Sequence, residues 1–209
     1  MVLEPVVILL AGAPGTGKST IANLLVQRLG LSHHLSTGFI RASIRHFLPD
    51  SQVQLMARHA FDAWEELPKP LDAGIDPVLQ GLMAQAEVLK PAIKECVGRA
   101  NREGIGLVVE GSHLIPQIFD PEELGATLLC VLDIPDRKLL QERALSANHS
   151  RRILNQTQLN RLLELQETIV GQARDFGRPV VMNNHLPDAI RQIRTLVKHV
   201  RPSPSNTKG

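Results

Sequence analysis

One short run near the N-terminus carries the residues best suited to chemistry. Gly12-Ala13-Pro14-Gly15-Thr16-Gly17-Lys18-Ser19 has the spacing G-x-x-x-x-G-K-[ST] and is followed by Thr20. Glycines let a loop curl until several backbone N–H groups point at one anion, and the positive end of a following helix adds to that field. Lys18 would reach the outer phosphates, and the Ser19 hydroxyl would ligate Mg²⁺. The run predicts a binding site for a nucleoside triphosphate with Mg²⁺; an ordinary glycine turn is the alternative.

A carboxylate follows another apolar run. Glu110 comes directly after Leu107-Val108-Val109, at the expected end of a strand. A carboxylate there can hold Mg²⁺ through water or orient an acceptor hydroxyl, so we predict that Glu110 is catalytic and binds the metal. The alternative is a helix-capping or surface glutamate. Asp133, after the run 128–132, is a rival metal ligand, although a carboxylate at this point can also begin a helix.

Two arginines and a histidine are predicted to bind the substrate. Arg41 and Arg45 lie four residues apart, which places both on one face of a helix. The guanidinium group is shaped to bind carboxylate or phosphate, and the alternative is a solvated basic face. His113 stands just past the Glu110 strand. It can contact the substrate or be a structural histidine bonded to the backbone.

A basic stretch later in the chain predicts a lid over about residues 137–155. Cations there would neutralise charge on a transferred phosphoryl group and help to exclude water, so Arg143 and Arg152 are predicted to be catalytic. A solvated charge run is the alternative. Asn183 and Asn184, after the last strand, are expected to line an adenine pocket or to form a turn. Residues 137–161 contain one acid, Glu142, and six basic residues: Arg137, Lys138, Arg143, Arg151, Arg152 and Arg161.

Apolar patterning predicts the elements that position these groups. Apolar runs predict strands at 6–10, 35–36, 107–110, 128–132 and 180–182. Helical periodicity predicts helices at 19–29, 39–47, part of 52–72, 76–103, 136–147, 156–175 and 187–200, with Pro91 kinking or dividing the long one. This alternation predicts an α/β fold with helices on both faces of a mostly parallel sheet, whose strand ends bind ligands. We expect one domain over 1–200 and a flexible tail over 201–209.

Composition excludes several classes of protein. The chain has 209 residues, a net charge of +2, 43% hydrophobic residues and 3% aromatic residues. These values argue against disorder, against a strongly basic nucleic-acid binder and against base-stacking platforms. The apolar runs are too short for a membrane span, and two cysteines are too few for a disulfide framework. We expect a cytoplasmic protein with buried thiols, no nucleic-acid or membrane partner, and a possible homodimer.

Several blocks in order resemble the 2-phosphoglycerate kinase family. They are GAPGTGKST, STGFIRASIR, HAFDAWEEL, LKPAIKECVGRANREGIGLVVEGSHLIP, DRKLLQERA and RLLELQETIVGQARDFGRPVVMNN, which together span roughly residues 5–200. The resemblance implies a P-loop NTPase three-layer sandwich of the nucleoside-kinase type, with strand order 2-3-1-4-5 and helical acceptor and lid segments. It also implies ATP- and Mg²⁺-dependent phosphorylation of 2-phosphoglycerate to 2,3-bisphosphoglycerate. One position departs from the family, because Gly38 stands where such kinases typically carry Asp.

The sequence therefore predicts a kinase for a small anionic metabolite. Two alternatives stay open. One is a kinase of the same build that acts on another metabolite or a nucleoside. The other is a nucleotide-binding switch module that has lost transfer chemistry, an interpretation that rests on the missing carboxylate at Gly38.

Overall fold

The computed structural model describes residues 5–146 and 154–200. Its centre is a five-stranded sheet in the order β2-β3-β1-β4-β5, in which every neighbouring pair is parallel. Both the predicted fold class and the predicted strand order are confirmed. The strands are β1 (Val7–Ala11), β2 (His33–Ser36), β3 (Leu107–Gly111), β4 (Leu128–Asp133) and β5 (Val180–Met182).

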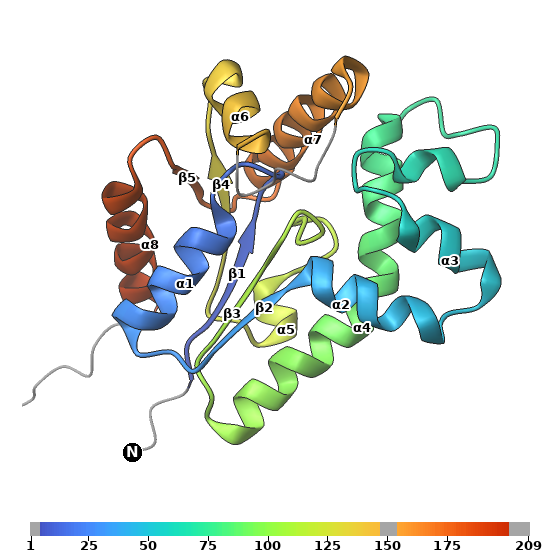
Figure 1. Cartoon of the computed structure of the whole chain (residues 1–209). Coiled ribbons are helices and arrows are strands. Elements are labelled where there is room, and N and C mark those ends of the chain that lie inside the picture. The colour runs from blue at the N-terminus through green and yellow to red at the C-terminus, as the bar shows by residue number, and fades with distance from the viewer. Residues whose placement is uncertain (1–4, 147–153, 201–209) are drawn as a thin grey trace, which may run out of the picture.

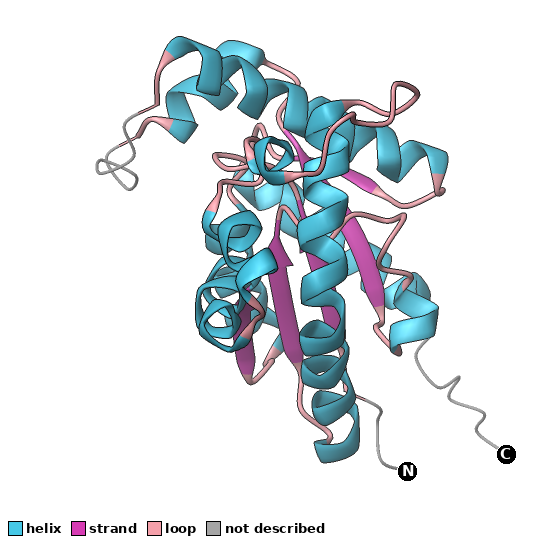
Figure 2. Cartoon of the chain, turned by 90° about the vertical axis from the view of Figure 1, so that its right-hand side faces the viewer, coloured by secondary structure: helices cyan, strands magenta, loops and turns pink. Residues whose placement is uncertain are grey.

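Helices cover both faces of the sheet (Figures 1 and 2). The central position of β1 in the sheet explains why its residues are all apolar. Ile8 and Leu10 pack into the core shared with α1 (Lys18–Leu29) and α8 (Leu186–Val200). Val7 and Leu9 pack into the core shared with α4 (Pro77–Glu103) and α7 (Gln156–Asp175). Because each face is buried, the strand has no polar side to alternate with its apolar one.

Shorter helices form a lobe beside α4 and the strand ends (Figure 1). The helix predicted at 39–47 is observed at Thr37–Ile44, and Arg45–Phe47 form a 3₁₀ turn instead of continuing it. In the 52–72 region the helix ends at Ala57, because the chain then turns to place Phe61 in the core. These elements are α2 (Thr37–Ile44), η1 (Arg45–Phe47), α3 (Asp50–Ala57) and η2 (Ala63–Glu66); α5 (Pro121–Leu124) and α6 (Arg137–Ala144) lie elsewhere.

The longest helix contains a proline. Helix α4 begins at the cap Asp76, whose side chain accepts a hydrogen bond from Leu79 N, and ends at Gly104. It remains one helix through Pro91, and a bend is visible along its length (Figure 1), so of the two predicted outcomes the structure shows the kink and not the division. A proline removes one helical hydrogen bond and crowds the preceding turn, which bends a well-packed helix without ending it.

Two further expectations concern the environment of the chain. Within 5–146 and 154–200, no helix combines the length and the apolar character needed to cross a membrane. Both cysteines are free thiols, but only Cys130 is buried, because Cys96 lies on a partly exposed side of α4. The tail 201–209 lies outside the described residues.

Gly81 tests how tightly η2 packs on α4. A Cβ at Gly81 would lie 2.2 Å from the backbone nitrogen of Trp64, so the helix admits no side chain there. We expect Gly81→Ala to lower the free energy of unfolding by about 1–3 kcal/mol, as overpacking does, although alanine normally favours a helix. Urea denaturation measures this change.

Gly171→Ala in α7 is the matched control for this substitution. A Cβ at Gly171 would meet nothing within 4 Å. Alanine there should therefore stabilise the protein by roughly 0.5–1 kcal/mol through helix propensity. Equal effects of the two substitutions would contradict the packing of η2 described above.

Candidate active site

The phosphate loop joins β1 to α1 and curls around its own backbone. Thr16 Oγ1 and Lys18 Nζ each donate a hydrogen bond to the carbonyl of Ala13, both at 2.8 Å. Gly17 has φ +86°, and a Cβ there would lie 2.5 Å from Asn183 Nδ2, so both conformation and space require glycine. The loop therefore holds a buried ammonium group beside backbone N–H groups, which suits a polyphosphate.

Two side chains from distant segments fix this loop. Gln166 on α7 accepts a hydrogen bond from Ala13 N at 2.8 Å and donates to Leu132 O at 2.9 Å. Asn183, after β5, donates to Thr16 O at 2.8 Å. Gln166 went unnoticed in the sequence because a single glutamine inside an amphipathic helix matches no motif. Asn183 supports the loop itself, while its predicted contact with adenine stays a prediction.

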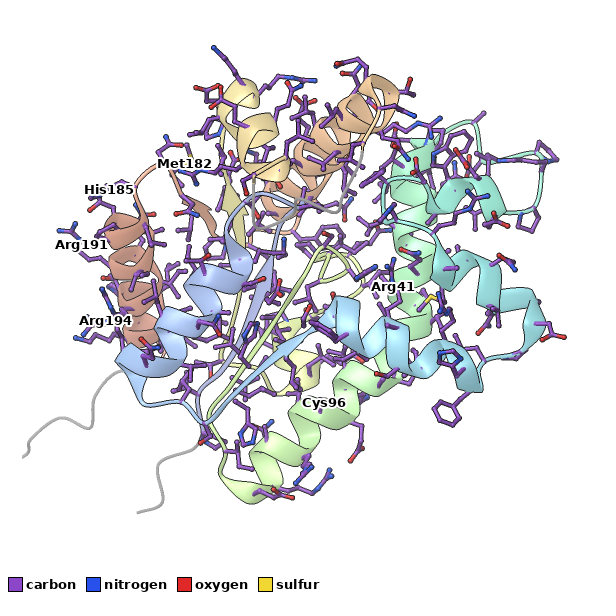
Figure 3. The ribbon with its side chains drawn as sticks, in the orientation of Figure 1. Arg41, Cys96, Met182, His185, Arg191 and Arg194 are labelled. Atoms are coloured by element: carbon purple, nitrogen blue, oxygen red, sulfur yellow. The ribbon has the colours of Figure 1, made fainter. Side chains whose placement is uncertain are left out.

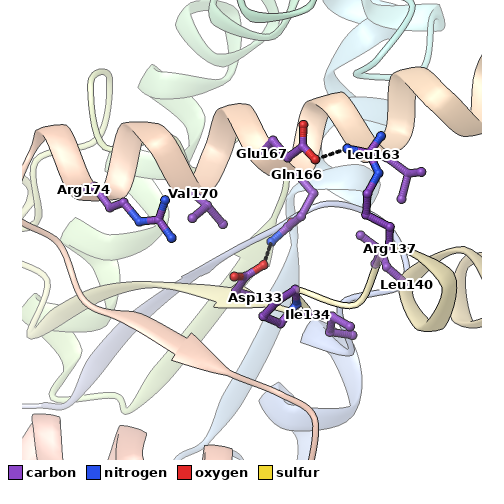
Figure 4. A pocket seen from close by; sticks show the side chains of 10 residues that line it. Asp133, Ile134, Arg137, Leu140, Leu163, Gln166, Glu167, Val170 and Arg174 are labelled. Carbon is purple, nitrogen blue, oxygen red and sulfur yellow. Dashed lines mark hydrogen bonds and ion pairs between the residues drawn. The ribbon is translucent and has the colours of Figure 1, made fainter.

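A cavity of about 150 Å³ lies between the end of β4, α6 and α7 (Figure 4). Its wall includes Gln166 and Asp133, whose Oδ1 accepts a hydrogen bond from Gln166 Nε2 at 3.0 Å. This bond gives Asp133 a structural partner. The carboxylate that begins α6 is Asp136, which accepts hydrogen bonds from the backbone nitrogens of Lys138 and Leu139.

Glu110 meets the phosphate loop at Ser19. The parallel register places Glu110 beside Leu10 and Ser36, and Ser19 Oγ donates to Glu110 Oε1 at 3.0 Å. Burial raises the pKa of Glu110, but His34, the charge of Lys18 and the Ser19 hydroxyl outweigh it and hold the pKa below its usual value. Glu110 is therefore a buried, ionised carboxylate.

These two oxygen groups fit Mg²⁺. A hydroxyl and an ionised carboxylate 3.0 Å apart are hard oxygen donors of the kind that Mg²⁺ prefers, so Ser19 and Glu110 would be its protein ligands. His34 is a neighbour that the sequence did not point to. Its Nε2 lies 3.7 Å from Glu110 Oε1, while its Nδ1 is hydrogen-bonded to Asn23 Oδ1 at 3.0 Å.

Arg41 projects from α2 on the side that faces α4, whereas Arg191 and Arg194 lie on the outer face of α8 (Figure 3). Burial and the charge of Arg45 lower the pKa of Arg41. Its Nη1 donates to the carbonyl of Arg58. No carboxylate of the described residues lies within 4.0 Å of it. Arg41 is thus a partly desolvated cation without an acidic partner in that part of the chain, a state that an anionic ligand would relieve.

His113 is fully engaged within the protein. Its Nδ1 is hydrogen-bonded to Thr37 Oγ1 at 2.9 Å and its Nε2 to Gln85 Oε1 at 3.1 Å. Burial, with the charges of Arg41 and Lys18, lowers its pKa to about 3. Both ring nitrogens are occupied and the ring is buried, which favours a positioning role over the predicted direct contact with substrate.

The described part of the predicted lid contributes one arginine near the phosphate loop. Arg143 Nη1 donates to Asn183 O at 2.9 Å, which connects α6 to the segment that holds Thr16. Arg152 lies outside the described residues, so its catalytic role stays a prediction. Arg161 forms ion pairs with Asp62 and Glu65, each at 2.8 Å.

The ion pairs of Arg161 also place two residues near η2. Asp62 is buried and is bound to α7 through Arg161 and Gln158. Trp64 lies between the cations of Arg161 and Lys69, at 5.0 and 4.8 Å from its ring centre, and forms part of the contact between η2 and α7.

Position 38 has room for a side chain. Gly38 is exposed in the first turn of α2, and a Cβ there would meet only Ser36 Oγ, at 3.5 Å. The backbone therefore does not require glycine at this position. Packing would also admit the Cβ of an aspartate at this position, so the fold does not exclude the residue that is missing here.

The fold is that of the P-loop kinases of small molecules. Two solved structures show it. One is a gluconokinase from Sinorhizobium meliloti 1021, at 19% identity and TM-score 0.50, matching 94% of this chain and 93% of that one. The other is a shikimate kinase from Acinetobacter baumannii in complex with shikimate, at 15% identity and TM-score 0.55, matching 95% and 96%.

Sequence comparison confirms the resemblance to 2-phosphoglycerate kinases. The chain is 30% identical over 192 residues to the 2-phosphoglycerate kinase of Pyrococcus horikoshii, covering 90% of this chain and 63% of that protein. It is 26% identical over 197 residues to that of Methanopyrus kandleri, covering 91% and 60%. The chain thus spans about three fifths of the length of these relatives.

A relative with another printed activity is also similar. The mevalonate-3-phosphate 5-kinase of Thermoplasma acidophilum is 26% identical over 176 residues, covering 82% of this chain and 83% of that protein. No protein-family model matches the sequence.

The buried His113 predicts a pH dependence of stability. Its pKa is about 3 when folded and about 6.5 when unfolded, so the unfolded chain binds more protons between these values. As pH falls below about 6.5, wild type should lose stability relative to His113→Gln, by up to about 1.4 kcal/mol per pH unit. Urea denaturation of both proteins between pH 7 and 4.5 measures this difference. Parallel stability profiles would contradict a neutral, buried His113.

Proposed function

We propose that the protein is an ATP- and Mg²⁺-dependent kinase that phosphorylates a hydroxyl group of a small anionic metabolite, with 2-phosphoglycerate as the leading acceptor. The product would then be 2,3-bisphosphoglycerate. The resemblance to 2-phosphoglycerate kinases supports this acceptor. The phosphate loop supports ATP as the phosphoryl donor.

The observation that carries the proposal is the state of Arg41. Its guanidinium is partly desolvated, and the described residues offer it no carboxylate within 4.0 Å. The charges of Arg41, Lys18 and Glu110 all act on the His113 ring, which supports a site in which the proposed acceptor cation lies near the phosphate-loop lysine and the proposed metal-binding carboxylate. An acceptor with a carboxylate or phosphate would compensate the charge of Arg41.

The residues divide the work between donor and acceptor. The N–H groups of the phosphate loop and Lys18 would bind the β- and γ-phosphates. Ser19 and Glu110 would hold Mg²⁺, which neutralises charge on the phosphate oxygens when it is bound. Arg41 would bind the acceptor anion and bring its hydroxyl toward the γ-phosphate.

The transfer step needs little help from a base. The acceptor oxygen forms a bond to the γ-phosphorus, the bond from that phosphorus to the β,γ-bridging oxygen breaks, and ADP leaves. The proton of the hydroxyl is released to solvent. Such transfers pass through a loose transition state that depends mainly on positioning and charge neutralisation. A kinase with Gly38 in place of a carboxylate is consistent with that requirement.

A second acceptor class has a specific observation in its favour. The similarity to a mevalonate-3-phosphate 5-kinase extends over most of both chains. Both printed names describe phosphorylation of a metabolite that already carries a phosphate. Another phosphorylated hydroxy acid is therefore the main rival to 2-phosphoglycerate, and a nucleotide switch without transfer remains the rival to the kinase.

A panel of acceptors with γ-labelled ATP tests these choices. It should contain 2-phosphoglycerate, 3-phosphoglycerate, mevalonate 3-phosphate, a nucleoside and a neutral sugar. Transfer to 2-phosphoglycerate with the highest kcat/KM is expected. Preferred transfer to a neutral sugar would overturn the anionic acceptor. Saturable ATP binding with no transfer, and only trace hydrolysis, would overturn the kinase.

Lys18→Ala should nearly abolish transfer. The ammonium group lies buried in the loop against Ala13 O, where it would reach the outer phosphates, so kcat/KM should fall at least about a hundredfold. The labelled-ATP assay at saturating acceptor measures this loss. Lys94→Ala, an exposed lysine on α4, is the control and should behave as wild type. A Lys18→Ala enzyme with more than a tenth of wild-type activity would remove Lys18 from the mechanism.

Arg41→Ala should chiefly raise the KM for the acceptor. A charged hydrogen bond made equally in the ground and transition states changes KM more than kcat, here by about 10- to 100-fold. Initial rates at varied 2-phosphoglycerate and fixed saturating ATP measure the change. Arg194→Ala, on the outer face of α8, is the control. If the acceptor KM stays the same, Arg41 does not belong to the acceptor site.

A further inference from the structure

One backbone carbonyl accepts hydrogen bonds from both Arg41 and the buried side chain of Gln85. The carbonyl of Arg58 accepts a hydrogen bond from Arg41 Nη1. It also accepts one from Gln85 Nε2, at 3.1 Å. The same amide nitrogen of Gln85 donates to the carbonyl of Leu55 at 2.6 Å. Gln85 therefore fixes the turn that follows α3, and that turn contains the carbonyl to which Arg41 donates its hydrogen bond.

The remaining contacts determine how the buried groups are oriented. Because Gln85 Nε2 donates twice to carbonyls, its Oε1 is the oxygen that faces His113, so His113 Nε2 must carry the proton. In the neutral ring, Nδ1 is then an acceptor and receives the Thr37 hydroxyl proton at 2.9 Å. Every donor in the series Thr37, His113, Gln85 finds one acceptor, in a single arrangement.

This series reaches Arg41 from two directions. Thr37 is the first residue of α2, the helix that carries Arg41, and it is buried. At the far end of the Arg41 side chain, the guanidinium donates a hydrogen bond to the Arg58 carbonyl. The backbone and the head group of Arg41 are therefore both tied to Gln85 and His113, which lie on α4 and just after β3.

We propose that Gln85 is a positioning residue for the acceptor site and that, together with His113, it sets the place of the Arg41 guanidinium. This inference rests on the proposed function, in which Arg41 binds the acceptor anion. A buried polar network that only stabilised the fold would change the free energy of unfolding without a selective effect on the acceptor. The two roles therefore differ in what a substitution at Gln85 does to each substrate.

Gln85→Met tests the inference because it keeps the shape of the side chain and removes its donors and acceptor. We expect the KM for 2-phosphoglycerate to rise about tenfold while the KM for ATP stays within twofold. Gln80→Met is the matched control: Gln80 lies on the same helix and bonds to Asp72 and Ile75, away from Arg41. It should leave both KM values unchanged.

A double-mutant cycle shows whether Gln85 acts through Arg41. In the Arg41→Ala background, Gln85→Met should add less than twofold to the acceptor KM. Full multiplication of the two effects would overturn the inference, as would equal changes in the KM values for ATP and acceptor. If Arg41→Ala alone leaves the acceptor KM or the binding of 2-phosphoglycerate unchanged, the proposed function of Arg41 has failed before Gln85 is considered.

A second measurement does not depend on transfer or on the stability of a Gln85 variant. The ¹⁵N spectrum of the wild-type imidazoles, with His113 assigned from its absence in His113→Gln, reports the tautomer. We expect a neutral His113 protonated on Nε2 at pH 7. Protonation on Nδ1, or a charged ring, would reverse or break the series of donors and overturn the inference.

Discussion

The phosphate loop must aim several backbone N–H groups at one point, although no regular element holds that shape. Bonds within the loop to Ala13 O, together with bonds from outside it, fix that shape before an anion arrives. Gln166 accepts from Ala13 N, and Asn183 donates to Thr16 O, from positions 153 and 167 residues away along the chain. The conformation of the loop therefore also depends on α7 and on the segment after β5. A site organised in this way needs little rearrangement when phosphate binds, which is the basis of electrostatic stabilisation by fixed dipoles.

The parallel sheet is what allows such distant residues to meet. Five strands that run the same way bring their carboxyl ends to one edge, so Ser36, Glu110 and the phosphate loop become neighbours. The hydrogen bond between Ser19 and Glu110 is a direct consequence of this register. A slip by one residue would turn Glu110 to the other face of the sheet and remove the carboxylate from the proposed Mg²⁺ site.

Local patterns could be predicted from the sequence, and contacts between distant segments could not. The glycine-lysine motif, the buried strands and Glu110 at a strand end follow from residues that are close along the chain. Gln166 and Gln85 could not be identified, because an amide in a helix has no distinguishing neighbours and its partners lie on other elements. The end of α3 at Ala57 was missed for the same reason, since a long-range contact of Phe61 with the core decides it.

Charge along the chain was also a poor guide to charge in space. The stretch 137–161 carries an excess of positive residues, yet the carboxylates that pair with Arg137 and Arg161 lie outside it. Arg161 pairs with Asp62 and Glu65 on the lobe beside α4, and Arg137 pairs with Glu167 on α7. Arg41 differs from both, because it is drawn out of water without a carboxylate partner among the described residues.

An unpaired, partly buried cation costs stability, and a bound anion would offset that cost. The protein accepts that cost at Arg41 and holds the guanidinium against a backbone carbonyl, which offers only a partial negative charge. A carboxylate in that place would neutralise the arginine and compete with the substrate. A carbonyl orients the cation and leaves its charge for a ligand, so in the proposed acceptor site the bond from Gln85 to the Arg58 carbonyl would help to place that charge.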